Sequence, residues 1–167
     1  MDGMAKLIIL RGNSGSGKTT TGEALQRKFG RGTMLISQDV VRREMLFVKD
    51  GPNPEASKLL LELALYGKSK CNIIILEGIL NSKWYKNLFE DLLNEFKDQI
   101  FAYYFHIPFE ETLNRHQQKP NTYEFGEKEM REWWNEKDLL NIIPEALLYK
   151  ELSLNEIVDI IYQDVIE

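Results

Sequence analysis

The sequence predicts an α/β protein in which a parallel sheet carries helices on both faces. Short apolar runs recur along the chain without alternating polar residues, which is typical of parallel strands that are buried on both sides. Segments with helical apolar spacing separate these runs, and such alternation indicates βαβ units with right-handed crossovers. The chain has 167 residues, so we expect a single domain over residues 1–167.

Five segments are predicted to be strands. They are residues 7–10, 34–36, 73–76, 100–107 and, more weakly defined, 146–149. The first three are almost entirely Ile, Leu and Met, and the fourth is aromatic and stops at Pro108. We therefore expect five parallel strands.

The segments between the strands carry helix signals at their ends. Three helices are predicted from their end signals: residues 17–29 with Gly30 as C-cap, Asn53-Pro54 to Gly67, and Ser82 through Trp84 to Phe96. Two more are predicted over 109–116 and 127–136. The capping box Ser153–Glu156 predicts the start of a C-terminal helix. The polar segment 117–126 has no helical or strand period. A loop of this length is often functional.

Net charge, cysteine content and the lack of long apolar runs each exclude or favour certain classes of protein. The formal net charge is −5, which argues against holding long duplex nucleic acid by phosphate neutralisation. The lone cysteine, Cys71, permits no internal disulfide and is expected to be a buried thiol. The first residues lack the pattern of a signal peptide, and no apolar run approaches the ~20 residues of a membrane span. We therefore expect a cytoplasmic protein without a membrane partner.

One motif carries chemistry. Its residues are Gly12, Asn13, Ser14, Gly15, Ser16, Gly17, Lys18 and Thr19, which fit G-x-x-x-x-G-K-[ST] at every required position. The motif follows a predicted strand and opens a predicted helix, as a Walker A phosphate loop requires. Backbone N–H groups and the helix N-terminus then bind phosphates. Lys18 reaches the terminal phosphates, Thr19 binds Mg²⁺, and Thr20 is added to the predicted ATP site.

Two kinds of phosphate-loop protein do not fit this sequence. A GTPase needs Asn-Lys-x-Asp after a strand, and Asn81-Ser82-Lys83 lacks the final acid. A transport ATPase needs a signature segment and a longer chain. Among P-loop proteins, this leaves the small phosphotransferases, which carry a lid and a compact acceptor site.

The chain resembles the small P-loop kinases, a broad group that contains polynucleotide 5′-kinases, gluconate kinase, chloramphenicol phosphotransferase and the zeta toxins. The resemblance rests on the phosphate loop, on Asp39-Val40-Val41-Arg42 after the second strand, and on Arg115 and Lys119 after the fourth. It implies a P-loop NTPase three-layer sandwich with strand order 2-3-1-4-5 and a small lid at about 115–131. It also implies that Asp39 accepts the proton of the acceptor hydroxyl and that Arg42 contacts the substrate or a phosphate.

The residues themselves leave alternatives open at Asp39 and Arg42. Asp39 ends a strand, where open α/β sheets place their ligands. As an N-cap it would put Arg42 at the third helical position, where the helix dipole disfavours a cation. The alternative is an ordinary cap with a solvated Arg42. Arg43 is expected at the surface.

Other candidates surround the predicted site. Glu77 and Gly78 end the third strand and are assigned to substrate binding. Many P-loop proteins carry an Asp here that orients Mg²⁺-bound water, and Glu77 is one methylene longer, so a choice between Mg²⁺ and the acceptor stays open. Arg115 is assigned a catalytic lid role and Lys119 an ATP contact, with Arg131 as a third lid cation. An ion pair with Glu111, four residues earlier, is the alternative for Arg115. The neighbouring Trp133 and Trp134 are expected to pack rather than stack on a base.

Together these features predict an ATP-dependent kinase that moves a γ-phosphoryl group to a hydroxyl. Its cofactors are ATP and Mg²⁺, and Lys18, Asp39 and Arg115 carry the chemistry. The sequence does not decide which acceptor is used. The candidates are a small molecule such as a sugar acid, a nucleoside or nucleotide, a nucleic-acid 5′ end, an antibiotic and a nucleotide sugar. The alternative is a nucleotide-binding regulatory protein without an acceptor.

Overall fold

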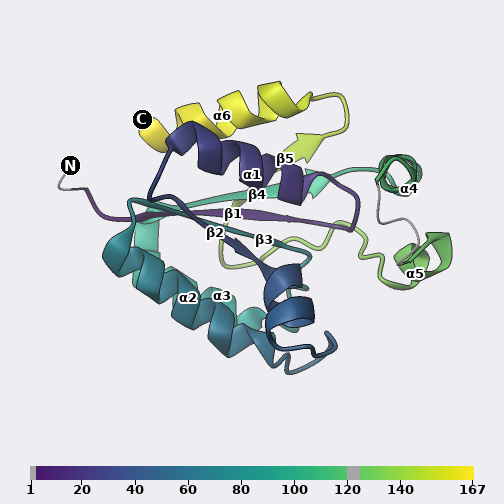
Figure 1. Cartoon of the computed structure of the whole chain (residues 1–167), viewed down its shortest axis with the longest axis horizontal. Helices are drawn as coiled ribbons and strands as arrows, with labels where there is room; N and C mark the ends of the chain where they lie inside the picture. Colours follow the sequence, from purple (N-terminus) through teal and green to yellow (C-terminus); the bar gives the residue numbers. More distant parts are fainter. Residues whose placement is uncertain (1–2, 120–124) are drawn as a thin grey trace.

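The computed structural model describes residues 3–119 and 125–167 and contains a five-stranded sheet in the order β2-β3-β1-β4-β5 (Figure 1). Every neighbouring pair of strands is parallel. The strands are β1 (Lys6–Gly12), β2 (Met34–Ser37), β3 (Ile73–Gly78), β4 (Ile100–His106) and β5 (Glu145–Tyr149). The predicted fold class, strand order and five strands are confirmed.

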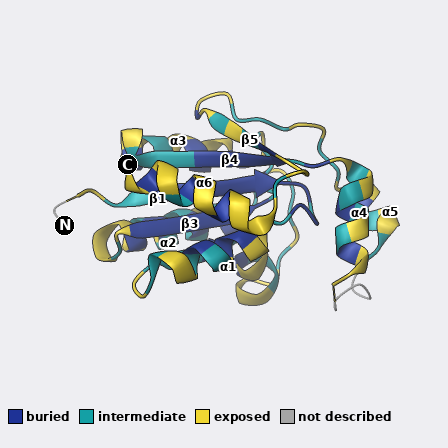
Figure 2. Cartoon of the chain, turned by 90° about the horizontal axis from the view of Figure 1, so that it is seen from above, coloured by how far each residue is buried: buried dark blue, intermediate teal, exposed yellow. Residues whose placement is uncertain are grey.

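Helices cover both faces of the sheet, as Figures 1 and 2 show. The first layer contains α1 (Lys18–Phe29) and α6 (Leu154–Ile166), and the second contains α2 (Ala56–Lys70) and α3 (Lys86–Phe96). Side chains of the central strand alternate between two apolar cores. Ile8 and Leu10 belong to the core that includes α1 and α6, whereas Leu7 and Ile9 belong to the core of α2 and α3. Burial on both sides explains why the strand is continuously apolar.

The remaining helices are short or lie outside the sandwich. Helices α4 (Phe109–Gln117) and α5 (Glu127–Glu132) lie beyond the carboxyl ends of the strands (Figure 1). The π-helix η1 (Val40–Met45) follows β2, and the 3₁₀-helix η2 (Lys97–Gln99) precedes β4. No helix in the described ranges is long and apolar enough to cross a bilayer. Residues 120–124 lie outside the described residues, so the predicted lid at 115–131 and the loop at 117–126 are seen only in part.

The second helix differs from its prediction at both ends. It begins at Ala56 rather than at Pro54, and it runs through Gly67 to Lys70. Gly67 is not a C-cap, because the helix needs it for close packing on the sheet. A Cβ at this position would lie 2.7 Å from Ile74 and 2.8 Å from Met34.

Three smaller predictions are also wrong. The helix expected from Ser82 begins at Lys86, because the Asn81 side chain accepts hydrogen bonds from the next backbone N–H groups and holds a turn that includes Trp84. The helix expected over 127–136 stops at Glu132. Cys71 is half-buried rather than fully buried.

A fully buried arginine joins the elements around the end of β1. The Arg11 guanidinium donates hydrogen bonds to the carboxylates of Glu145, at 3.0 Å, and Asp138, at 2.9 Å, and to the carbonyl of Leu80. Its central carbon lies 5.5 Å from the ring centre of Phe89 and 5.6 Å from that of Tyr104. A buried cation of this kind is tolerated because its hydrogen bonds to carboxylates and a carbonyl, and its contacts with aromatic rings, replace the hydration that it loses on burial.

Arg11→Met should destabilise the protein by about 3–5 kcal/mol, because the buried carboxylate of Glu145 would lose its ion-pair partner and remain charged. Urea denaturation measures this loss. Lys28→Met, which breaks the exposed ion pair with Asp159, should cost less than about 1 kcal/mol. Adding Glu145→Gln to Arg11→Met should restore part of the stability. Equal effects of the two single variants would contradict the assignment.

Candidate active site

The phosphate loop runs from the end of β1 to the start of α1 and lies directly against α4. Gly15 and Gly17 adopt left-handed backbone conformations, with φ of 80° and 106°. A Cβ at Gly15 would lie only 2.6 Å from the carbonyl oxygen of Thr112 in α4. Glycine is therefore required here both by the turn and by the neighbouring helix. The N-terminus of α1 opens onto the loop at Lys18, which is the geometry that binds phosphate.

Lys18 extends along its own loop. Its ammonium donates a 2.8 Å hydrogen bond to the Asn13 carbonyl, and the residue is only 7% exposed. Burial lowers the pKa of Lys18, and the negative charges of Glu77 and Asp39 partly oppose this effect. The ammonium is thus short of hydration inside the loop, and a phosphate oxygen would replace the missing water.

Glu77 contacts the predicted magnesium ligand. The Thr19 hydroxyl donates a 3.0 Å hydrogen bond to the Glu77 carboxylate, which is 2% exposed at the end of β3. Burial raises the pKa of Glu77, while the Lys18 charge and hydrogen bonds from Ser37 and Thr19 act in the opposite direction. Mg²⁺ prefers a hydroxyl and one carboxylate together with phosphates and waters, so this pair fits it. Residues 3–119 and 125–167 contain no cluster of three His, Cys, Asp or Glu side chains that would hold a metal unaided.

The lid-side cations separate into two groups. Arg115 donates at 2.8 Å to the Ser16 carbonyl and at 2.9 Å to Glu111, so the loop contact and the alternative ion pair are both present. Lys119 lines a cavity beside the loop. Arg131 pairs with Glu127 and lies 4.3 Å from the Phe109 ring centre, and it does not line that cavity. Arg115 therefore contacts the phosphate loop, and Lys119 shares a cavity with it, whereas Arg131 does not line that cavity.

That cavity, of about 350 Å³, extends from the phosphate loop to the connection between β5 and α6. Its lining includes Gly15, Ser16, Gly17, Thr20, Arg115 and Lys119 together with Phe105, Leu152, Ser153, Leu154 and Ile157. The last five were not predicted as site residues. Only the capping box at Ser153 marks this connection in the sequence, and it signals a helix start rather than a ligand.

Asp39 does not cap a helix, so the predicted alternative of an N-cap is wrong. Its backbone is already helical, and its side chain accepts no capping hydrogen bond. Its carboxylate instead lies 3.4 Å from Arg42 and 3.8 Å from Arg43. The π-helical turn η1 brings both arginines to one carboxylate. The side chain of Arg43, which was expected at the surface, is 37% exposed, and its guanidinium lies over the rings of Phe125 and Trp133.

Asp39 and Arg42 face a second cavity of about 500 Å³, which we call the η1 cavity. Its lining comprises Ser14, Gln38, Asp39, Arg42, Arg43, Lys49, Asp50, Ile79, Trp84, Glu132, Trp133, Trp134 and Asn135. One wall is a buried network in which Gln38 donates to Asp50 and Tyr85, and Tyr85 donates to Asp50 at 2.7 Å. This network was not predicted, because its members are far apart in the sequence.

Gly78 has a packing role in this wall. A Cβ at Gly78 would lie 2.6 Å from the Cβ of Gln38. Gln38 therefore makes a close approach at Gly78, which is also predicted to bind substrate.

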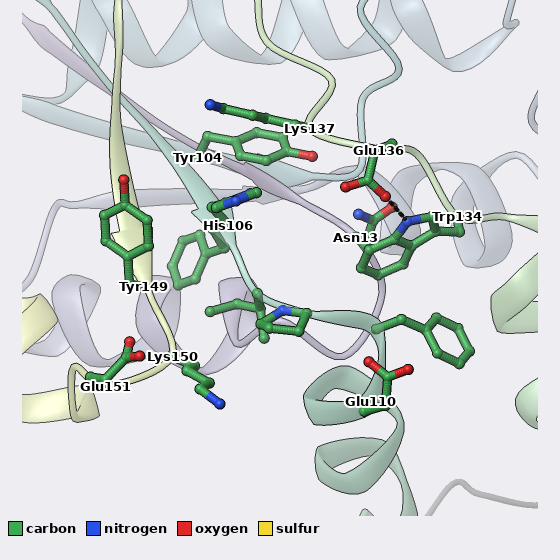
Figure 3. Close-up of a pocket in the computed structure, with 14 residues that line it drawn as sticks. Asn13, Tyr104, His106, Glu110, Trp134, Glu136, Lys137, Tyr149, Lys150 and Glu151 are labelled. Carbon is green, nitrogen blue, oxygen red and sulfur yellow. Dashed lines mark hydrogen bonds between the residues drawn. The ribbon is translucent and has the colours of Figure 1, made fainter.

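A reciprocal pair of amides joins the phosphate loop to the η1 cavity. Asn13 donates at 2.7 Å to the Asn135 carbonyl, and the Asn135 N–H donates at 2.8 Å to the Asn13 side chain. Asn135 follows the two tryptophans, so this pair fixes their segment against the loop. On the other side of Trp134 lies a third cavity of about 530 Å³, shown in Figure 3, where Asn13, Tyr104, His106 and acidic and basic side chains meet.

A parallel sheet in this order, with a phosphate loop between its central strand and the following helix, is the fold of a P-loop NTPase. The chain belongs to the family described as an AAA domain, whose model matches residues 7–137. No curated protein matches its sequence.

Solved structures share the fold over nearly the whole chain. An APS kinase, CysC, from Mycobacterium tuberculosis in complex with AMPPNP and APS has a TM-score of 0.70 at 15% identity, covering 98% of this chain and 99% of that one. A shikimate kinase from Acinetobacter baumannii in complex with shikimate has a TM-score of 0.63 at 18% identity, with coverages of 97% and 93%. A gluconokinase from Sinorhizobium meliloti has a TM-score of 0.63 at 14% identity, with coverages of 98% and 93%.

The buried Lys18 should make stability depend on alkaline pH. Because its folded pKa is lowered below the ordinary 10.5, the folded chain releases this proton at a lower pH than the unfolded chain. The protein should therefore gain stability relative to Lys18→Met as pH rises from the folded pKa to 10.5. Urea denaturation of both proteins over this range measures the difference. A difference that does not change with pH would show that burial does not disfavour the ammonium.

Proposed function

We propose that this protein is an ATP-dependent kinase that transfers the γ-phosphoryl group of ATP to a hydroxyl of a second substrate. The observation that carries the proposal is the position of the phosphate loop between two separate cavities. One adjoins the β5–α6 connection and suits the nucleoside part of ATP. The other contains Asp39 and Arg42 and suits an acceptor. Two cavities that meet at one phosphate site are what phosphoryl transfer between two substrates requires.

The phosphates of ATP would lie in the loop formed by Gly12 to Thr19. Lys18 and Arg115 stabilise the charge on the transferring group, and Lys119 adds a third cation. Thr19 and Glu77 would hold Mg²⁺, directly or through water, and the bound ion would supply positive charge to the phosphates of ATP. The residues at about 115–131 act as a lid that excludes water, within one domain of residues 1–167.

Asp39 orients the acceptor and takes its proton. The acceptor oxygen forms a bond to the γ-phosphorus, the bond from that phosphorus to the β-phosphate oxygen breaks, and ADP leaves. Asp39 receives the hydroxyl proton as this happens. Its charge acts on Lys18, which supports a position close to the phosphate loop. Arg42 binds an anionic group of the acceptor.

Labelled ATP offered with a panel of acceptors should give one labelled product in stoichiometric amount. The panel contains a sugar acid, a cyclic alcohol, nucleotides and single strands with a free 5′-hydroxyl. Lys18→Ala should abolish transfer and keep a cooperative thermal transition, because it opens no apolar cavity. Binding of ATP without transfer to any acceptor would favour the alternative, a nucleotide-binding regulatory protein.

Asp39→Asn should slow the chemical step by ~10²–10⁴, because the amide keeps the shape but cannot accept a proton. ATP affinity and thermal stability should change little, since Asp39 caps no helix and its side chain is 58% exposed. Single-turnover kinetics and ATP titration measure the two effects. Normal turnover by Asp39→Asn would remove Asp39 from the mechanism.

A further inference from the structure

The side chain of Asn13 connects the phosphate loop to a segment that lies 122 residues later in the chain. Its amide nitrogen donates to the Asn135 carbonyl at 2.7 Å, and its amide oxygen accepts from the Asn135 N–H at 2.8 Å. Asn13 is only 6% exposed, so water competes little for these two bonds. A carboxylate at this position could not donate to the carbonyl, whereas a side-chain amide matches both partners at once.

The backbone carbonyl of Asn13 is bound from inside the loop. The Lys18 ammonium donates to this carbonyl at 2.8 Å, and the Ser16 N–H donates to it at 3.3 Å. Phosphate oxygens bound in the loop would compete for the ammonium, because they carry negative charge and a carbonyl does not. Phosphate binding would therefore change the contacts of the same residue that holds Asn135.

The segment held by Asn13 forms a wall between two cavities. Trp133, Trp134 and Asn135 line the η1 cavity. Asn13 and Trp134 also line the third cavity, where Figure 3 shows them. The Asn135 side chain adds longer hydrogen bonds, of 3.3 Å, to Asn81 and to the Trp133 carbonyl. The pair of Asn13 with Asn135 thus joins the phosphate loop to residues 133–135, which form one wall of the proposed acceptor site.

We propose that Asn13 is a positioning residue through which phosphates bound in the loop stabilise residues 133–135 at the acceptor site. This inference rests on the proposed function, because it assumes phosphates in the loop and an acceptor in the η1 cavity. Phosphates restrict the loop backbone, and the Asn13 side chain then loses less conformational freedom when it binds Asn135. The pair strengthens, and the wall becomes more rigid before the acceptor binds.

Tryptophan emission measures this effect at a distance from the ligand. All three tryptophans of the chain line the η1 cavity, whereas the cavity assigned to the nucleoside of ATP has no tryptophan among its described lining residues. Inorganic tripolyphosphate with Mg²⁺ fills the loop without a base or a sugar. It should change the emission saturably, with the same dissociation constant that calorimetry gives. Binding without a change in emission would overturn the proposal.

Two alanine variants connect the emission change to the amide pair. Asn13→Ala should bind tripolyphosphate within about threefold of the unaltered protein, because alanine keeps the backbone N–H and carbonyl groups of the loop. It should nevertheless lose most of the emission change. Asn135→Ala is the matched control and should keep the change, since both bonds of Asn13 go to the main chain of residue 135. Thermal unfolding confirms that each variant is folded. A full emission change in Asn13→Ala would overturn the proposal.

Hydrogen exchange in the unaltered protein gives an independent test that needs no variant. The Asn135 N–H, which Asn13 binds, should exchange about tenfold more slowly when tripolyphosphate saturates the loop. Amides within α2 should not change, because α2 contributes no residue to the three cavities among their described lining residues. An unchanged exchange rate at Asn135 would overturn the proposal.

Failure of this inference can be told from failure of the proposed function, because neither measurement depends on turnover. Transfer from ATP to an acceptor without the emission and exchange responses would overturn only the inference. Both responses without transfer to any acceptor would overturn only the kinase proposal. A loop that binds no tripolyphosphate would overturn both.

Discussion

The buried guanidinium of Arg11 is the contact on which the geometry around the phosphate loop depends. It lies one residue before Gly12 and binds Leu80, Asp138 and Glu145, which belong to three different segments. One of these segments leads to Trp84 and another follows Asn135, so both contribute walls of the η1 cavity. Because its donors are shared among these partners, a shift of any segment would leave charge buried without compensation. The phosphate loop and the walls of the η1 cavity are thus fixed to one another through the buried charge of Arg11.

Contacts from beyond β4 complete this arrangement. Thr112 in α4 lies against Gly15, Arg115 donates to Ser16, and Asn135 exchanges hydrogen bonds with Asn13. The loop motif is local in the sequence, but its surroundings come from residues about a hundred positions later. The phosphate loop and the η1 cavity therefore share walls, which are held together by direct contacts.

The sequence predicted what is encoded locally. Continuous apolar runs revealed the five strands, and the spacing of Gly12, Gly17 and Lys18 revealed the phosphate loop. Features created by distant contacts were not predictable. Arg11 follows an apolar run and gives no sign of its partners more than a hundred residues away. The Gln38–Asp50–Tyr85 network and the placement of Trp84 and Trp133 in one cavity depend on the folded chain in the same way. Asp39 was correctly placed at the end of a strand, but its interpretation as a possible cap assumed a regular helix where the chain forms a wider turn.

The strand order also has a consequence for how the chain folds. β1 pairs with β3 and β4 and has no contact in the sheet with β2, the strand that follows it. The first half of a growing chain therefore contains two apolar strands that cannot pair with each other in the native way. Sheet formation must wait until residues 73–78 are available, and β3 then joins β1 and β2 at once. Such non-local pairing slows folding, and the early apolar strands are exposed to aggregation while they wait for their partner.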